Sequence, residues 1–118
     1  MFLNLNHYNL DVFKTARELR INAYKIMRKL PESEKFNLTD QIRRASTSIV
    51  LNIFEGSSRK SKTERKRYYE MARGSVIEID TCCDIIVEEN YMSKEELNEL
   101  GTKIKTTFIL LSNLINSN

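Results

Sequence analysis

Hydrophobic side chains recur along most of the chain at alternating steps of three and four residues, the period that places them on one face of an α-helix. The pattern predicts four helices, over residues of about 10–30, 39–56, 61–90 and 94–116. The predicted core positions are, helix by helix, Val12, Ala16, Leu19, Ala23, Ile26 or Met27, and Leu30; Leu38, Ile42, Ala45, Ile49 and Ile53; Tyr68, Ala72, Ser75, Ile79, Cys82 or Cys83, and Ile86; Leu97, Leu100, Ile104, Phe108, Leu111 and Ile115. Tyr69 is expected to point away from its stripe.

Residues that typically begin or end helices mark the end of the first predicted helix and both ends of the second. Pro31 is expected to end the first helix because it restricts the residue before it and lacks an amide donor. Asn37 or Thr39 can cap the second helix, and Gly56 stands where a left-handed cap would end it. The second helix is therefore predicted to stop at Gly56.

Two capping-box patterns, Ser61-Lys62-Thr63-Glu64 and Ser93-Lys94-Glu95-Glu96, mark the starts of the third and fourth helices. Gly74-Ser75 lies inside the third helix, where small residues allow another helix to approach closely. The segments that connect the four predicted helices are short. We therefore expect an all-α fold: an antiparallel, up-down-up-down four-helix bundle.

The composition is consistent with one domain over residues 1–118. Three Gly and one Pro leave too few turn formers for an all-β chain. The longest apolar run, Phe108 to Leu111, is far too short to cross a bilayer, so we expect no membrane association and a cytoplasmic protein. The two cysteines are sequence neighbours and are expected to stay reduced.

Charge is distributed unevenly along the chain. Residues 1–75 carry 16 basic and 8 acidic side chains, whereas residues 76–118 carry 3 basic and 8 acidic ones. Six of the basic side chains and a single acidic one fall within residues 59–67, at the turn between the second and third predicted helices. This segment gives the chain its net positive charge.

Such a run of cations at a helix N-terminus favours a polyanion such as nucleic acid as the ligand. Arg43, Arg44 and Arg73 lie nearby in the sequence, and Tyr68 and Tyr69 follow the run directly. We expect the tyrosines to pack rather than to stack on bases. The predicted nucleic-acid-binding residues are Arg43, Arg44, Arg59, Lys60, Lys62, Arg65, Lys66 and Arg67.

Catalytic and metal chemistry find no support in the residue pattern. The only histidine, His7, lies in an N-terminal segment expected to be frayed, and Cys83 is expected to behave as a small buried hydrophobe. Asp80, Asp84 and Glu88 are spaced to form an acidic stripe, but a di-iron site would also need Glu-x-x-His pairs. We therefore expect no catalytic residue, no metal and no cofactor.

Several short motifs together resemble the 23S rRNA intervening-sequence protein family, also called four helix bundle proteins. They are Leu30-Pro31, Gln41-Ile42-Arg43-Arg44-Ala45, Ser48-Ile49, Asn52-Ile53, Glu55-Gly56-Ser57, Arg59, and Ala72-Arg73-Gly74-Ser75 with Glu78. The likeness covers about residues 10–114. It implies a small bacterial four-helix bundle that assembles as a ring-shaped homopentamer, sometimes encoded within interrupted large-subunit ribosomal RNA genes.

The family is also similar to the accessory protein of diversity-generating retroelements, a basic pentameric barrel that binds nucleic acid and a reverse transcriptase. The expected function is thus a non-enzymatic, oligomeric nucleic-acid-binding accessory protein. The alternative is a scaffold whose basic surface docks an acidic, reverse-transcriptase-like partner. The structural motif residues carried over are Asn52, Glu55, Gly56, Gly74 and Ser75. We expect Asn52 and Glu55 to bond Arg43, Arg44 or backbone ends across helices or protomers.

Overall fold

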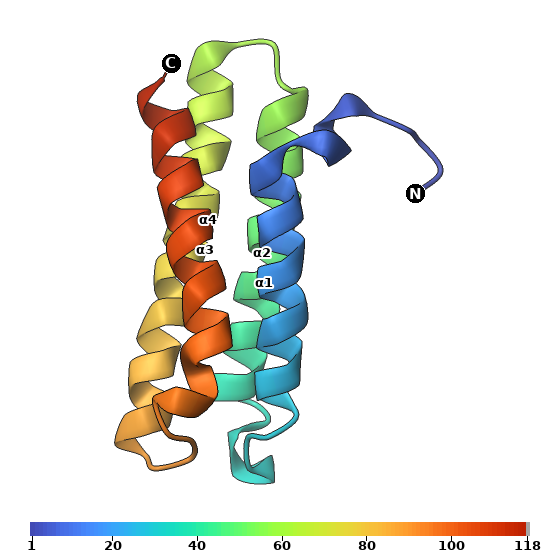
Figure 1. Cartoon of the computed structure of the whole chain (residues 1–118). Helices are drawn as coiled ribbons and strands as arrows, with labels where there is room; N and C mark the ends of the chain where they lie inside the picture. The colour runs from blue at the N-terminus through green and yellow to red at the C-terminus, as the bar shows by residue number, and fades with distance from the viewer. Residues whose placement is uncertain (118) are drawn as a thin grey trace.

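The fold was analysed in a computed structural model that describes residues 1–117. Four long helices run alternately up and down: α1 (Asp11–Met27), α2 (Leu38–Ser58), α3 (Lys62–Glu88) and α4 (Asn98–Asn116) (Figure 1). Three single 3₁₀ turns accompany them, at Asn6–Asn9, Glu32–Glu34 and Glu95–Leu97, and no strand occurs among the described residues. The predicted all-α, antiparallel four-helix bundle is confirmed.

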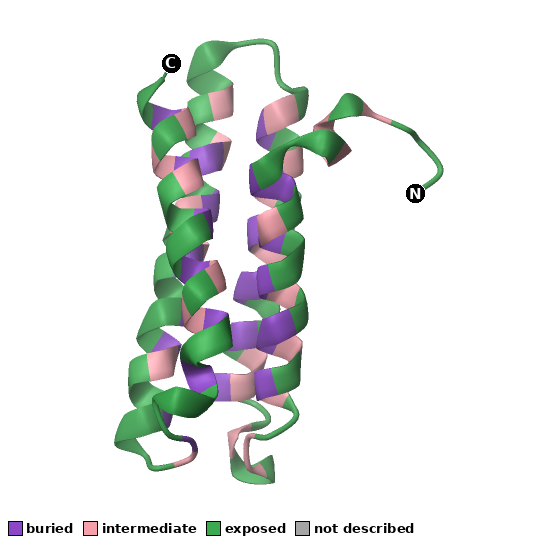
Figure 2. Ribbon diagram, in the orientation of Figure 1, coloured by how far each residue is buried: buried purple, intermediate pink, exposed green. Residues whose placement is uncertain are grey.

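Each helix packs against its two neighbours, in the order α1, α2, α3, α4 and back to α1. The buried residues of all four helices face the interior of the bundle, and exposed residues cover its outside (Figure 2). The α1/α2 side and the α3/α4 side are therefore opposite sides of the bundle. The turn between α2 and α3 lies at one end of its 44 Å long axis, and the α1–α2 and α3–α4 loops lie together at the other (Figure 1).

The connection between α1 and α2 differs in detail from the prediction. α1 ends at Met27, before Pro31, because the next residues already form a turn. Asn37 is the residue before α2, but its side chain does not cap the helix. The Glu34 carboxylate does so instead: its Oε1 accepts from the backbone N–H of Leu38 at 3.4 Å.

The first predicted capping box starts α3, but the second does not start α4: its residues lead into the 3₁₀ turn Glu95–Leu97, and α4 begins only at Asn98, without a side-chain cap. Ser61 Oγ accepts from the N–H of Glu64 at 3.4 Å at the start of α3. In the second box the bonds are reciprocal: Ser93 Oγ accepts from Glu96 N–H at 3.2 Å, and Glu96 Oε1 accepts from Ser93 N–H at 3.0 Å. The residue that ends α3 was not predicted from the sequence. Asn90 has a φ of 60°, the left-handed conformation that reverses the chain there.

Gly56 and Tyr69 correct two predictions at once. Gly56 does not end α2, which continues to Ser58. A Cβ at Gly56 would lie only 2.8 Å from Cε1 of Tyr69, so the glycine is needed because the ring packs directly on its backbone. Tyr69 is buried, whereas Tyr68, which was predicted to face the core, is half-exposed. The core stripe of α3 is therefore displaced by one residue at its N-terminal end.

Two further core positions are displaced by one residue in the same way. Val76, rather than Ser75, is fully buried in α3. In α4, Thr107 is buried in place of the predicted Phe108. Its hydroxyl donates to the backbone carbonyl of Lys103 at 2.7 Å. Phe108 lies at the surface, 38% exposed, and its ring carries the guanidinium of Arg73. A hydroxyl bonded inside its own helix can occupy an apolar core without an unsatisfied polar atom.

The N-terminal segment is packed against the bundle rather than frayed at His7. His7 Nε2 lies 2.8 Å from the backbone carbonyl of Ser57, near the C-terminus of α2. Its ring is 5.3 Å from that of Phe54, and Tyr8 and Phe13 complete the aromatic cluster. His7 therefore ties the start of the chain to the α2 end that leads into the basic turn.

Candidate nucleic-acid interface

The six cations of residues 59–67, called the basic turn below, lie together on the α2–α3 connection. The side chain of Arg65 closes this turn. Its Nη1 donates to the backbone carbonyls of Arg59 at 3.1 Å and Lys60 at 2.7 Å. A guanidinium that satisfies two carbonyls at a helix end holds the loop in one conformation. Arg65 therefore has a structural role, and its charge adds to the local positive potential.

Arg59 is also held in place within the turn. Its Nη2 donates to Glu55 Oε2 at 2.8 Å, and its guanidinium carbon lies 5.1 Å from the centre of the Tyr68 ring. The hydrogen bond to Glu55 and the electrostatic interaction with Tyr68 raise the pKa of the Arg59 guanidinium. The charge of Arg59 is thus partly balanced by Glu55, and Tyr68 is covered rather than free to stack on a base.

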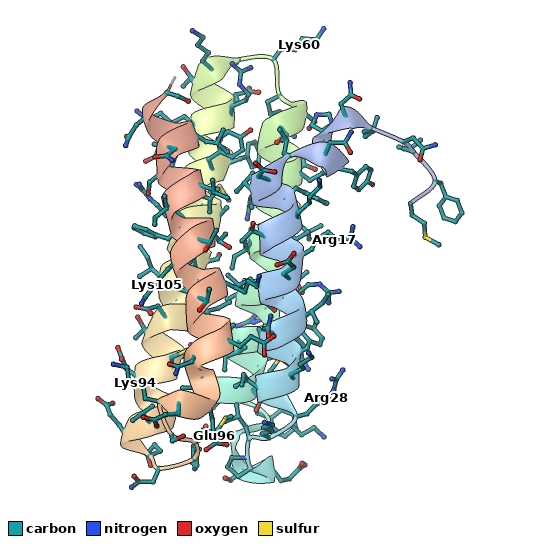
Figure 3. The ribbon with its side chains drawn as sticks, in the orientation of Figure 1. Arg17, Arg28, Lys60, Lys94, Glu96 and Lys105 are labelled. Atoms are coloured by element: carbon teal, nitrogen blue, oxygen red, sulfur yellow. The ribbon has the colours of Figure 1, made fainter. Side chains whose placement is uncertain are left out.

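The remaining four cations of the basic turn are Lys60, Lys62, Lys66 and Arg67. All four are exposed, and none forms an ion pair with another described residue. Figure 3 shows Lys60 at the apex of the turn, pointing away from the bundle. They surround the first turns of α3, whose free N–H groups add positive potential. Exposed cations beside free helix N–H groups are a combination that can bind anions such as phosphate.

Arg43 and Arg44 do not belong to this cluster, although the sequence analysis grouped them with it. They lie in the first turns of α2, about 24 Å from Arg59 by the helical rise of sixteen residues. Both are paired with Asp40; the Arg44 Nε to Asp40 Oδ2 distance is 3.5 Å. Nearness in sequence to the basic turn does not mean nearness in space on a helix this long.

The motif residues Asn52 and Glu55 do not bond Arg43 or Arg44, so that expectation is wrong within the chain. Asn52 Nδ2 donates to the backbone carbonyl and the hydroxyl of Ser48, each at 2.9 Å. Ser48 in turn accepts from Ser75 Oγ at 3.1 Å, which joins α2 to α3. These polar groups therefore satisfy one another across the α2/α3 side.

Gly74 does not let another helix of the same chain approach. It is exposed, and a Cβ added there would meet no heavy atom within 4 Å. Its neighbour Ser75 lines a hollow between α2 and α3. The lining of this hollow includes further motif residues: Gln41, Arg44, Ala45, Ser48 and Glu78. These motif residues of α2 and α3 thus share one side of the bundle, whereas Glu55, Gly56, Ser57 and Arg59 lie at the basic turn.

A second group of cations, Arg17, Arg20 and Arg28, was not predicted from the sequence. Arg17 and Arg20 lie on α1 and line one hollow, and Arg28 follows the helix and projects to the same side as Arg17 (Figure 3). The guanidinium of Arg20 lies 5.0 Å from the Tyr24 ring centre, and that of Arg17 lies 6.0 Å from the Phe13 ring centre. Their spacing of three and then eight residues is the signal that would have revealed the shared edge.

The arrangement of side chains in the described residues does not support a metal-binding or catalytic site. Within residues 1–117 no three or more His, Cys, Asp or Glu side chains are placed to hold a metal ion. Cys82 and Cys83 are free thiols. Burial, with smaller contributions from Asp80, the Cys82 thiol and Asp84, raises the pKa of Cys83 to about 12. Across the same residues, no helix combines the length and the apolar character needed to span a membrane.

These features define a small four-helix bundle with a basic turn at one end. The model of the 23S rRNA-intervening sequence protein family matches residues 8–113, and the chain belongs to that family. The fold is similar to the 1.70 Å crystal structure of a protein of unknown function from the S23 ribosomal protein family of Bacteroides thetaiotaomicron. The TM-score is 0.81 at 21% identity, over 88% of this chain and 97% of that one. No functionally curated protein matches the sequence.

Proposed function

We propose that this protein is a non-enzymatic nucleic-acid-binding protein that contacts phosphate groups through the basic turn. The observation that carries the proposal is the state of its cations: two arginines fix the turn, and Lys60, Lys62, Lys66 and Arg67 remain exposed without counter-charges. A rigid loop that presents unpaired cations loses little conformational entropy when it binds.

A salt titration tests this proposal. Labelled RNA and DNA are titrated with the wild-type protein and with a K60A/K62A/K66A/R67A variant at several salt concentrations. If all four cations contact duplex phosphates, the slope of log K against log salt becomes shallower by about 3.6 in the variant. The matched control compares K66A/R67A with K94A/K105A, which removes two cations from α4 and the loop before it. Equal losses in both pairs would show only a general charge effect.

The scaffold alternative predicts a different outcome. If wild-type protein binds neither RNA nor DNA even at low salt, the basic turn would instead dock an acidic protein partner, such as a reverse-transcriptase-like protein. The oppositely charged side of the bundle gives some support for protein contacts: Asp80, Asp84 and Glu88 line a groove between α3 and α4, together with Lys94 and Lys105. Pull-down with an acidic partner then becomes the relevant experiment.

We also propose that the protein is a homo-oligomer, a pentamer by resemblance to its family. Gly74 supports this: its open backbone has no partner within the chain, so a neighbouring protomer can pack there. The negative charge of the α3/α4 groove favours head-to-tail contact with a positive region of the next protomer. Sedimentation of wild type and Gly74→Leu tests this. A wild-type monomer at micromolar concentration would contradict the proposal.

A further inference from the structure

A second cationic surface runs along the α1/α2 side, and we call it the arginine edge: Arg17 and Arg20 of α1, Arg28 directly after α1, and Arg43 of α2. Arg17 and Arg28 are eleven residues apart, which is close to three whole turns, so they share one face. Figure 3 shows both projecting to the same side of α1, away from α3 and α4. Arg17 and Arg20 line a hollow with Val50 of α2 and with residues of the N-terminal segment, among them Met1, Leu3 and Leu5.

The arginine edge is not neutralised by its surroundings. Arg17, Arg20 and Arg28 form no ion pair within residues 1–117, and the guanidinium of Arg43 stays half-exposed although it pairs with Asp40. The guanidinium carbons of Arg17 and Arg20 lie within cation–π range of the Phe13 and Tyr24 rings, at 6.0 and 5.0 Å from the ring centres. A ring is not a hydrogen-bond acceptor for all five guanidinium N–H groups, so these groups can also bond phosphate oxygens.

The arginine edge is in line with the basic turn. α1 and α2 are antiparallel, so Arg17 lies toward the end of the bundle that carries Lys60 and Arg28 lies toward the other end (Figure 3). Arg17 and Arg28 are separated by about 16 Å of helical rise. On the opposite side of the bundle, the groove between α3 and α4 has three carboxylates against two lysines, and so is not a cationic surface. A long anionic ligand bound at the turn is therefore directed along α1 and α2.

The rings beside these cations indicate which form of nucleic acid fits. Proteins that bind single strands present exposed rings on which bases stack. On this side Arg59 lies over Tyr68 and Arg20 over Tyr24, and the Phe13 ring beside Arg17 is buried; the most exposed rings, Phe2 and Phe36, lie in the N-terminal segment and the α1–α2 loop. The surface thus offers guanidinium groups to a phosphate backbone and few aromatic faces to unpaired bases.

We propose that the arginine edge is a second phosphate-contacting surface, which together with the basic turn binds the backbone of a double-stranded nucleic acid. This inference rests on the proposed function and goes beyond it in two respects: it adds Arg17, Arg20, Arg28 and Arg43, and it specifies a duplex. Contact along the bundle fits backbone recognition because no side chain needs to reach a base edge.

The test uses the full chain with 20-base-pair RNA and DNA duplexes and the matching single strands, each titrated at several salt concentrations. R17Q/R28Q is compared with K94Q/K105Q, which removes the same charge from the other side. For duplex, we expect R17Q/R28Q to make the slope of log K against log salt shallower by about 1.8, and K94Q/K105Q to leave it near wild type. Wild type should bind duplex more tightly than single strand.

Each of the other possible outcomes refutes a different part of the proposal. If wild type binds no nucleic acid, the proposed function fails and this inference with it. If removing Lys60, Lys62, Lys66 and Arg67 weakens binding but R17Q/R28Q behaves like K94Q/K105Q, only the arginine edge is refuted. Tighter binding of single strands refutes the duplex assignment. If sedimentation shows that R17Q/R28Q changes the oligomer size, the edge is a contact between copies and the proposal is wrong.

Discussion

The hydroxyl of Tyr91 donates a hydrogen bond to Oε2 of Glu34 at 2.8 Å, although the two residues are 57 positions apart in the chain. This bond joins the α3–α4 loop to the α1–α2 loop at the end of the bundle opposite the basic turn. The same carboxylate accepts from Asn37 and from the N–H of Leu38 through Oε1. Glu34 therefore caps α2 and holds the two loops together.

Tyr91→Phe should lower the stability of the protein in a pH-dependent way. The Tyr91 hydrogen bond is the largest cause that lowers the pKa of Glu34, so Glu34 stabilises the fold as a carboxylate. This contribution is fully present above the ordinary glutamate pKa of about 4.3 and is lost as pH falls through the lowered value. The urea midpoint of Y91F should lie below that of wild type at pH 7, and the difference should shrink toward pH 3.

The matched control is Tyr24→Phe, since the Tyr24 hydroxyl has no hydrogen-bond partner among the described residues. Y24F should unfold at the wild-type urea concentration at both pH values. An equal difference between Y91F and wild type at pH 7 and pH 3 would contradict the role given to Glu34.

Gly56→Ala and Gly101→Ala should change stability in opposite directions. Alanine is favoured over glycine inside a helix by about 1 kcal/mol. At Gly101 the new methyl meets nothing within 4 Å, so G101A should stabilise by about 0.5–1 kcal/mol. At Gly56 the methyl would press on the buried Tyr69 ring, and overpacking costs about 1–3 kcal/mol. Thermal and urea unfolding measure both; stabilisation by G56A would show that the ring moves freely aside.

The helices could be predicted from the sequence because the apolar period is long and regular, and stripes such as Ile42, Ala45, Ile49 and Ile53 are all buried. The burial of Tyr69, in place of Tyr68, could not be predicted from the sequence. Tyr68 and Tyr69 are adjacent rings of equal size, and the choice between them depends on contact with α2. Gly56 was misread for a related reason: a sequence does not say whether a glycine supplies conformational freedom or the absence of a Cβ.

The candidate interface was predictable only where it is local in sequence. The basic turn is a continuous run, so its cations had to lie together in any fold. Arg17, Arg20 and Arg28 form no continuous charge run, although their helical spacing places them on one side of α1, and Arg43 joins them only because α2 packs on α1. Arg43 and Arg44 show the opposite error, because a helix carries them away from the turn they precede.

Cys83 should react slowly with alkylating reagents. Only the thiolate is nucleophilic, and burial raises the pKa of Cys83 to about 12, while burial and Glu78 also raise the pKa of Cys82. At pH 7.5 iodoacetamide should therefore modify both thiols far more slowly in the folded protein than in 6 M guanidinium chloride. Mass spectrometry over time measures the two rates. Equal rates would mean that α3 opens readily around these residues.

Glu55→Ala should strengthen nucleic-acid binding while leaving the fold intact. Glu55 is an exposed carboxylate that pairs with Arg59, and exposed pairs are worth about 0.2–1 kcal/mol. Its removal leaves Arg59 fully charged and uncompensated within the basic turn, so affinity at low salt should rise by about 1.5- to 5-fold, the equivalent of that energy. The slope of log K against log salt should also steepen, because Arg59 becomes available to phosphate.

Glu99→Ala provides the control for E55A, because it removes the same charge from the start of α4, far from the turn. E99A should bind nucleic acid with the wild-type affinity and salt slope, and both variants should unfold within about 0.5 kcal/mol of wild type. Weaker binding by E55A than by wild type would show that Glu55 matters more for positioning Arg59 over Tyr68 than for masking its charge. The structure predicts the reverse, because the Tyr68 ring still supports the guanidinium after Glu55 is gone.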